Sequence, residues 1–185
     1  MTQTLTPSLT LEDFLERPET KPALEYINGT VVEKNMPQGE HSRLQYKLCS
    51  AISTVAETAK VACAFPELRC TFGGRSIVPD ISVFRWERIP RTDTGKIANR
   101  FELYPDWVIE ILSPNQSSSQ ALDKLLQCSQ AGTSLGWLIN PTEESIWVIR
   151  EHQRIDVFTA HTTLPVLEGI ELQLTVDEIL GWLMI

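Results

Sequence analysis

A short apolar run with an acidic residue at its centre constrains this chain more than any other feature. The run is Asp106-Trp-Val-Ile-Glu-Ile-Leu-Ser113, and Pro105 and Pro114 bound it. Near-continuous apolar character over this length is typical of a strand at the centre of a sheet, covered on both faces. Glu110 would then lie in the buried middle of that strand. Because burial of an unpaired carboxylate is costly, Glu110 requires a partner cation or a metal.

A second acidic residue, Asp80, lies in a similar apolar segment from Ile77 to Phe84. Two interpretations of Glu110 are open: a structural ion pair or hydrogen-bonded acid, and a metal ligand. Asp80 favours the second, since two acids on neighbouring strands can converge on one cation. Mg²⁺ takes oxygen ligands and keeps several waters, so two carboxylates, a backbone carbonyl and a phosphate oxygen would complete a site.

Periodic patterns elsewhere predict a mixed α/β architecture, with helices packed on one sheet whose strands run in mixed directions. Helices are expected over residues 10–15, with Thr10 and Asp13 as its cap, over about 40–60, over 117–131, and after Thr175. Strands are expected at 24–27 and 30–33 around Asn28-Gly29, and at 61–72, 77–84, 106–113, 136–140, 146–150 and 154–159. A polar loop is predicted from Arg85 to about Glu102.

Length and composition predict one domain spanning residues 1–185. The chain has 185 residues, of which 42% are hydrophobic, and single domains usually have roughly 100 to 200 residues. Its apolar runs are far shorter than the roughly 20 residues needed to cross a bilayer, and residues 1–7 lack a leader pattern. The cysteines lack paired motifs, which favours reduced thiols: Cys49, Cys63, Cys70 and Cys128. We therefore expect a cytoplasmic protein that neither spans a membrane nor is secreted.

The charge balance argues against a nonspecific nucleic-acid binder. Sixteen basic and twenty-four acidic side chains give a formal charge of -8, which opposes binding to a phosphate backbone. A divalent cation and a local basic strip could still make one site attractive to phosphate. The segment 85–100 carries such a strip around Trp86, although a solvated loop explains that segment better than a DNA contact does.

Four segments together carry a resemblance to a known family. They are Val78-Pro-Asp80-Ile-Ser-Val83, Pro105-Asp-Trp-Val-Ile-Glu110-Ile-Leu-Ser-Pro114, Asp123-Lys124-Leu125 and Gly136-Trp-Leu-Ile-Asn-Pro141. The chain resembles the Uma-type restriction endonuclease family of the PD-(D/E)XK nuclease superfamily, from the hairpin at 24–29 to about Arg150. The resemblance implies a restriction-endonuclease-like core, with a mixed central sheet flanked by helices.

The resemblance also implies a catalytic site. It suggests an endonuclease that uses Mg²⁺, or Mn²⁺, to hydrolyse DNA phosphodiester bonds, and that pairs as a homodimer. Asp80 and Glu110 would be the acidic, metal-binding pair, with the carbonyl of Ile111 as a further ligand. The superfamily pattern places a lysine two residues after the glutamate, where this chain has Leu112. The resemblance transfers that catalytic role to Lys124, whose ammonium would orient the attacking water or stabilise charge on the phosphate.

The periodicity around Lys124 leads to a different expectation. At 100° per residue, Lys124 lies roughly 140° from the centre of the stripe of Leu122, Leu125 and Leu126. Periodicity alone therefore predicts a solvent-facing ammonium, and the family resemblance is what favours a role in the site.

Several other polar residues are left out of the predicted site. Glu25 and His41 match the family pattern, but a lone histidine at a helix start is more often a surface or capping group. Ser113 is better explained by turn formation than as a nucleophile, because no histidine lies at a recognisable spacing from it. Asp106 would lie about 13 Å along the strand from Glu110, too far to share a metal, and is expected to begin the strand.

Two functions remain open from the sequence. The first is a metal-dependent DNA endonuclease, in which Asp80, Glu110 and Lys124 converge. The second is a catalytically inactive nuclease-fold module acting in nucleic-acid binding or dimerisation, in which they do not converge. A different hydrolase or transferase is disfavoured, since no phosphate loop, nucleotide fingerprint or activated nucleophile is visible. The apolar end at 182–185 fits either a dimer contact or packing on the chain's own core.

Overall fold

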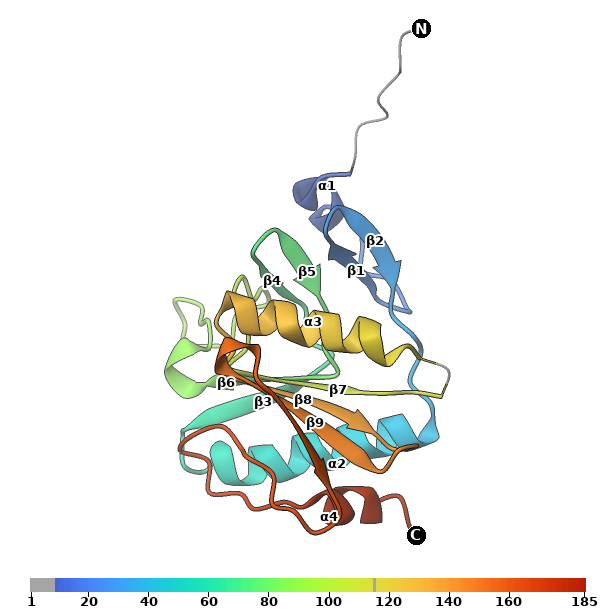
Figure 1. The fold of residues 1–185 in the computed structure, drawn as a ribbon. Coiled ribbons are helices and arrows are strands. Elements are labelled where there is room, and N and C mark those ends of the chain that lie inside the picture. Colours follow the sequence, from blue (N-terminus) through green and yellow to red (C-terminus); the bar gives the residue numbers. More distant parts are fainter. Residues whose placement is uncertain (1–8, 115) are drawn as a thin grey trace, which may run out of the picture.

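The fold is built on a six-stranded mixed sheet (Figure 1). In a computed structural model, which describes residues 9–114 and 116–185, the strand order is β10-β9-β8-β7-β6-β3. The bounds are β3 Ala62–Pro66, β6 Ile81–Arg85, β7 Trp107–Ile111, β8 Leu135–Asn140, β9 Ser145–Arg150 and β10 Ile155–Thr159. Strands β7 and β8 pair in parallel, and the other neighbours pair antiparallel. The mixed sheet confirms the predicted fold class.

Helices cover both faces of this sheet (Figure 1). Helix α2, Gly39–Ala56, and the short α4, Val176–Gly181, pack on one face, and α3, Ser118–Ala131, covers the other. Alternate side chains of β7 point to the two layers, so Trp107 packs with α2 while Val108 packs with α3. Glu110 shares the parity of Val108 and therefore points from the centre of the sheet toward α3.

A second, four-stranded antiparallel sheet lies beside the central one (Figure 1). Its order is β2-β1-β5-β4, with bounds β1 Leu24–Ile27, β2 Thr30–Glu33, β4 Cys70–Phe72 and β5 Arg75–Ile77. The predicted hairpin is confirmed, because Asn28 and Gly29 both have positive φ angles, 51° and 80°, as a type I′ turn requires. Helix α1, Leu11–Leu15, begins at the predicted capping box of Thr10 and Asp13.

The prediction of two strands over residues 61–84 is wrong, because this segment forms four. Pro66 ends β3, and Glu67 takes a positive φ of 48°, so the chain leaves the central sheet there. It forms the β4–β5 hairpin in the second sheet and returns to pair β6 with β3. Asp80 consequently lies where the chain crosses from the second sheet back into the central one.

Other predicted elements agree with the structure apart from shifted ends. The strand predicted over residues 106–113, for example, spans only Trp107–Ile111. Helix α2 ends at Ala56 rather than near Lys60, because Lys60 adopts a positive φ of 54° and turns the chain into β3. The second capping box, formed by Thr175 and Glu178, begins α4 as predicted. In the predicted loop from Arg85, the guanidinium of Arg88 pairs with Asp106 at 2.6 Å, so this cation folds back onto the chain.

Several sequence predictions concern the chain as a whole. Residues 1–7, in which no leader pattern is found, lie outside the described residues. No helix within the described part of the chain is long and apolar enough to cross a membrane. All four cysteines are free thiols, as expected. At the C-terminus, Trp182 and Leu183 pack against the chain's own core, whereas Met184 and Ile185 are exposed.

Candidate functional site

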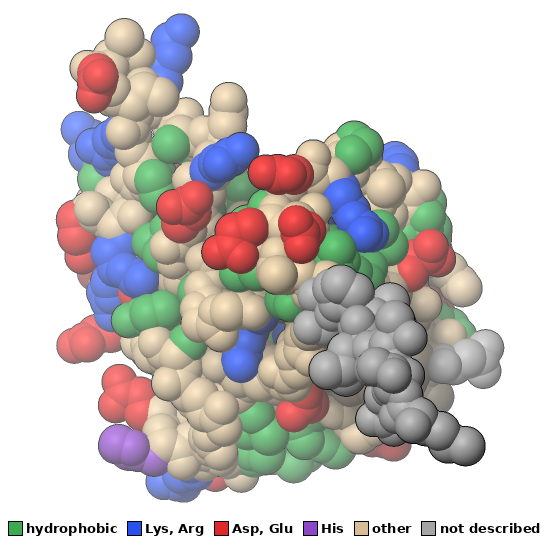
Figure 2. Space-filling model, turned by 90° about the horizontal axis from the view of Figure 1, so that it is seen from above, with side chains coloured by type: hydrophobic (Ala, Val, Ile, Leu, Met, Phe, Trp, Pro, Cys, Tyr) green, Lys and Arg blue, Asp and Glu red, His purple; other side chains and the backbone are tan. Residues whose placement is uncertain are grey.

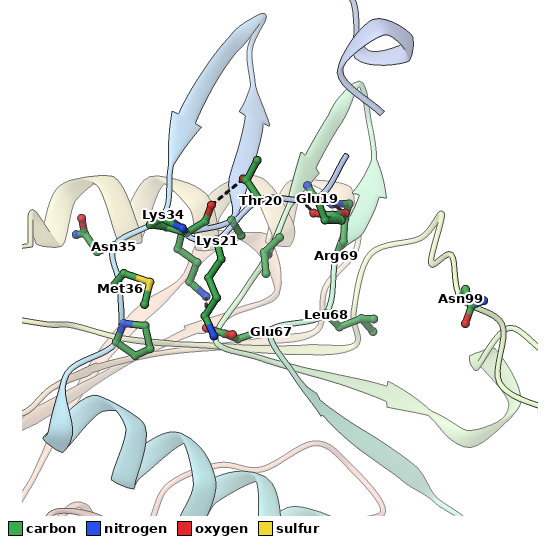
Figure 3. Close-up of a pocket in the computed structure, with 14 residues that line it drawn as sticks. Glu19, Thr20, Lys21, Lys34, Asn35, Met36, Glu67, Leu68, Arg69 and Asn99 are labelled. Carbon is green, nitrogen blue, oxygen red and sulfur yellow. Dashed lines mark hydrogen bonds and ion pairs between the residues drawn. The ribbon is translucent and has the colours of Figure 1, made fainter. Parts of the chain in front are cut away.

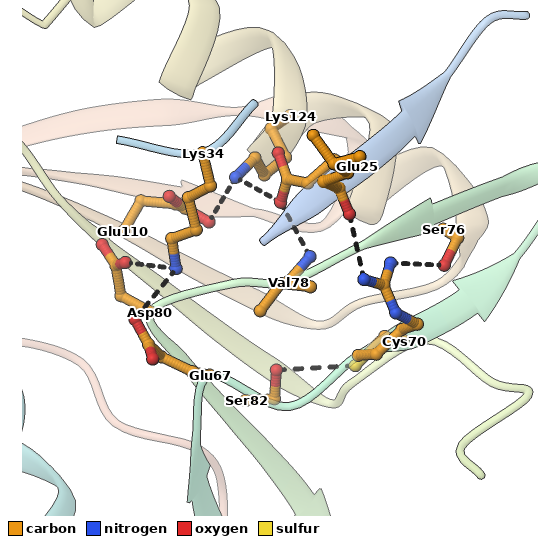
Figure 4. Close-up of polar contacts among 12 residues, drawn as sticks. Glu25, Lys34, Glu67, Cys70, Ser76, Val78, Asp80, Ser82, Glu110 and Lys124 are labelled. Atoms are coloured by element: carbon orange, nitrogen blue, oxygen red, sulfur yellow. Dashed lines mark hydrogen bonds and ion pairs between the residues drawn. The ribbon is translucent and has the colours of Figure 1, made fainter. Parts of the chain in front are cut away.

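A cavity of about 230 Å³ lies where the N-terminal hairpin, the central sheet and α3 meet. Its walls include buried charged side chains from several elements: Glu25 of β1, Lys34 just after β2, Asp80 just before β6, Glu110 of β7 and Lys124 of α3. Figure 4 shows these side chains pointing toward one another. The structure therefore brings together the three residues predicted from the sequence, Asp80, Glu110 and Lys124, contrary to the geometry expected of an inactive module.

Lys124 joins two buried carboxylates. Its Nζ lies 3.1 Å from Glu110 Oε1 and 3.0 Å from Glu25 Oε1, and the Lys124 side chain is only 10% exposed. Glu25 Oε1 also accepts a hydrogen bond of 2.7 Å from the backbone N–H of Val78. Glu25 thus ties α3 to the segment that leads into Asp80.

The periodicity argument that placed Lys124 in solvent is wrong. The face of α3 that meets the sheet contains Ala121, Leu125 and Cys128, and Lys124 lies on that same face at the i+3 position. Leu122 and Leu126 are only partly buried at its edge. The error arose because the small side chains of Ala121 and Cys128 carry little weight in a hydrophobic pattern, although both are buried on the face toward the sheet.

Asp80 is held at both carboxylate oxygens. Its Oδ2 accepts a hydrogen bond of 2.7 Å from the N–H of Ile111, while Oδ1 lies 2.7 Å from Lys34 Nζ and 3.2 Å from His41 Nε2. Its backbone carbonyl accepts a hydrogen bond of 2.8 Å from Gln45. Burial opposes ionisation, but the contacts with His41 and Lys34 outweigh it and hold the pKa of Asp80 well below its usual range.

His41 links Asp80 to Ser113. His41 is buried near the start of α2, and its Nδ1 lies 3.1 Å from Ser113 Oγ. Ser113 also forms the predicted turn, since its carbonyl accepts a 3.0 Å hydrogen bond from Gln116 N–H. His41 is therefore a structural partner of the site, although sequence spacing gave no sign of its contact with Ser113.

Glu110 and Lys124 form a charged pair as deeply buried as that of Lys34 and Asp80. Burial raises the pKa of Glu110 to about 7; the Lys124 ammonium opposes this rise, and the charges of Asp80 and Glu25 add to it. Burial alone would lower the pKa of Lys124, but Glu110 and Glu25 outweigh it and raise that pKa. The lysine therefore stays cationic at neutral pH, whereas Glu110, with a pKa of about 7, changes its charge near neutral pH.

Comparison with known proteins connects this cavity to a family. The Uma2 family model, described as "Putative restriction endonuclease", matches residues 11–177, a range that includes every cavity residue named above. The chain belongs to the Uma2 family. A crystal structure from Anabaena variabilis ATCC 29413, titled as that of "a putative nuclease belonging to DUF820", is similar to it at 48% identity and a TM-score of 0.92. The likeness covers 95% of this chain and 99% of that one. No curated protein matches the chain.

Three residues that contact the predicted site residues were not included in the site predicted from the sequence. Two of them had a recognisable sequence signal, and one did not. Glu25 and His41 match the family pattern but were set aside as single polar residues. Lys34 follows a short exposed strand with no motif around it, and its contact with Asp80 depends on the tertiary structure, including the pairing of β1 with β2. Asp106, expected to begin the strand, lies directly before β7, where it accepts a hydrogen bond of 2.8 Å from Arg85 N–H, and it does not line the cavity.

The donor atoms in the Uma2 cavity suit a hard divalent cation. Asp80 and Glu110 offer carboxylate oxygens, which Mg²⁺ prefers while keeping several waters. Asp80 Oδ1 is buried, yet within the described residues it makes no hydrogen bond of regular geometry. In the same part of the chain, no group of three or more His, Cys, Asp or Glu side chains is arranged to hold a metal. A metal here would therefore rest on two carboxylates and water, with the Ile111 carbonyl as the further ligand that the family resemblance implies.

Proposed function

We propose that this Uma2 protein is a metal-dependent endonuclease that hydrolyses DNA phosphodiester bonds. Asp80 and Glu110 would hold Mg²⁺ or Mn²⁺, and Lys124 would assist. The observation that carries the proposal is the convergence of these three side chains, from three different elements, on one cavity. Membership of the Uma2 family supports the same reaction class.

Each residue contributes a distinct property to the proposed reaction. A bound divalent cation would stabilise negative charge on the phosphate and lower the pKa of an attacking water. Lys124 supplies a fixed ammonium that would orient that water or the phosphate, in place of the lysine absent at Leu112. Glu25 positions Lys124 through their 3.0 Å contact, and His41 positions Asp80. The two lysines of the cavity offset two of its three buried carboxylates, so a net negative charge remains to attract a cation when all three are ionised.

The first test is cleavage of supercoiled and linear DNA by the purified protein, with Mg²⁺, with Mn²⁺ and with EDTA. We expect metal-dependent cleavage that falls at least about a hundredfold in Asp80→Asn, Glu110→Gln and Lys124→Met. Matched controls are Asp93→Asn and Lys60→Met, which change exposed residues outside the cavity and should cleave as wild type does. Circular dichroism of each variant separates lost activity from lost folding.

Two outcomes would contradict the proposal in different ways. Cleavage that persists in Asp80→Asn and Glu110→Gln would place the active site elsewhere. If the wild-type protein does not cleave, and its Mg²⁺ binding does not depend on Asp80 or Glu110, the inactive nuclease-fold module becomes the better interpretation, which Leu112 in place of the strand lysine already favours.

A further inference from the structure

Lys34 is anchored so that its side chain reaches Asp80. Its backbone N–H donates a 2.9 Å hydrogen bond to the carbonyl of Ala23, which extends the β1–β2 hairpin by one residue. From this fixed point the side chain enters the cavity, where Nζ lies 2.7 Å from Asp80 Oδ1. The Lys34 side chain is 10% exposed, so this ion pair is shielded from water.

The contact between Lys34 and Asp80 is close but weakly directional. Neither Lys34 Nζ nor Asp80 Oδ1 makes a hydrogen bond of regular geometry with any described residue. The other oxygen, Oδ2, is already taken by the N–H of Ile111. Oδ1 is therefore the atom that Asp80 offers to the cavity, and the ammonium stands beside it chiefly by charge attraction. A buried cation without its full set of hydrogen bonds is costly to retain.

A second carboxylate provides Lys34 with another position. Glu67 Oε1 lies 4.0 Å from Lys34 Nζ, and the Glu67 side chain is 48% exposed. The backbone of Glu67 is fixed close to Asp80, because its N–H donates a 3.1 Å hydrogen bond to the Asp80 carbonyl. Lys34 could thus exchange Asp80 for Glu67 by side-chain rotation alone.

Lys34 also stands between two cavities. Lys34 and Asn35 line both the cavity of Asp80 and Glu110 and a larger neighbouring cavity of about 440 Å³. Figure 3 shows Lys34, Lys21 and Glu67 at this larger cavity. Movement of the ammonium from Asp80 to Glu67 would shift its charge from the smaller cavity toward the larger one. It would leave Asp80 Oδ1 with the His41 contact alone.

We propose that Lys34 is a built-in counter-ion of Asp80 that a divalent cation must displace, and that Glu67 receives the displaced ammonium. This inference rests on the proposed role of Asp80 as a metal ligand. It assigns the lysine a function that opposes metal binding, distinct from the assisting role of Lys124. A divalent cation carries twice the charge of the ammonium and brings its own oxygen-rich shell, so it can replace the ammonium at Oδ1.

The test measures metal binding and stability rather than cleavage. Mn²⁺ and Mg²⁺ affinities are determined by titration calorimetry, and thermal unfolding is followed in EDTA and in Mg²⁺. We expect Lys34→Met to bind either metal at least about tenfold more tightly than wild type. The same variant should unfold at a lower temperature in EDTA and regain stability in Mg²⁺. Lys21→Met, an exposed lysine at the larger cavity, serves as the control and should leave both measurements unchanged.

Glu67→Gln tests the second half of the inference without removing a buried charge. It should weaken metal binding severalfold, because the displaced ammonium loses its alternative partner. In the Lys34→Met background the same change should have no effect, because that variant has no ammonium at position 34 for Glu67 to pair with. Equal effects of Glu67→Gln in both backgrounds would overturn the assignment of Glu67.

The remaining outcomes separate this inference from the proposed function. Metal affinity in Lys34→Met that equals or falls below that of wild type overturns the counter-ion role, even if Asp80→Asn abolishes binding and so upholds the metal site. If Asp80→Asn binds metal as wild type does, the metal site itself fails and the inference fails with it.

Discussion

At the scale of single residues, the burial of Glu110 affects both the stability of the fold and the charge of the candidate site. It is 2% exposed at the centre of β7, and burial raises its pKa to about 7, although Lys124 lies 3.1 Å away. The pKa of Glu110 in the folded state is therefore higher than the ordinary value of 4.5. Folding favours the protonated acid, and ionisation of Glu110 destabilises the metal-free protein.

This pKa predicts how stability changes with pH. The stabilising contribution of protonated Glu110 is fully present below about pH 4.5 and is lost as the pH rises through 7. Relative to Glu110→Gln, whose side chain does not titrate, the wild-type protein should lose up to about 3 kcal/mol of unfolding free energy between pH 4.5 and 8. Urea unfolding in EDTA at several pH values measures the difference. Parallel curves for the two proteins would mean that Lys124 keeps Glu110 ionised throughout.

At the scale of elements, the end of α3 shows how a single glycine sets the helix against the sheet. Gly132 follows the helix with a φ of 119°, a conformation that favours glycine, and its N–H caps the helix by bonding to the carbonyl of Ser129. A Cβ atom at Gly132 would lie 2.6 Å from the ring of Tyr104. The close approach to Tyr104 and the left-handed conformation of Gly132 together favour glycine at the position where α3 ends.

Replacement of Gly132 should therefore destabilise the protein. We expect Gly132→Ala to lower the free energy of unfolding by about 1 to 3 kcal/mol, through backbone strain and the clash with Tyr104. Gly181→Ala is the matched control, because a Cβ there meets no atom within 4 Å, and it should be neutral or slightly stabilising. Chemical denaturation measures both. A loss in Gly181→Ala equal to that in Gly132→Ala would rule out the steric explanation.

At the scale of the whole molecule, the net charge of -8 limits how DNA can be bound. Figure 2 shows acidic and basic side chains interspersed over the face seen from above, rather than a continuous basic surface. In the loop after β6, Arg88 pairs with Asp106 and the Arg91 guanidinium lies 5.5 Å from the centre of the Trp86 ring, so both cations already have partners within the chain. A cation held in the cavity would then strengthen the attraction for a phosphate backbone.

A divalent cation should accordingly tighten the binding of DNA. At physiological salt, fluorescence anisotropy of a labelled duplex should detect at least about tenfold tighter binding in Ca²⁺, used to support binding without cleavage, than in EDTA. Asp80→Asn should remove that gain. Equally tight binding in EDTA would reveal a basic surface independent of the cavity.

The homodimer expected from the family resemblance stays a prediction, and sedimentation of the purified protein tests it. The single domain and the cytoplasmic location stay predictions as well.

The sequence by itself determined the features that depend on residues close to one another along the chain. The apolar run around Glu110 predicted a buried strand because both faces of a central strand must be covered. The Asn28-Gly29 hairpin and the caps at Thr10 and Thr175 followed from backbone preferences that act over a few residues. Asp80 was found the same way, as an acid in an apolar segment, and the family resemblance added Lys124.

Only the tertiary structure decided which charges meet. Lys124 and Glu25 are 99 positions apart, and their contact depends on the N-terminal hairpin lying over α3. Lys34 reaches Asp80 because the chain leaves the central sheet at Pro66 and re-enters it directly after Asp80, a path that local patterns did not predict. Hydrophobic periodicity shows which face of α3 is apolar. It does not show that the sheet facing α3 carries a buried carboxylate, Glu110, that can pair with an ammonium. That long-range electrostatic match, rather than local propensity, placed the lysines of this site.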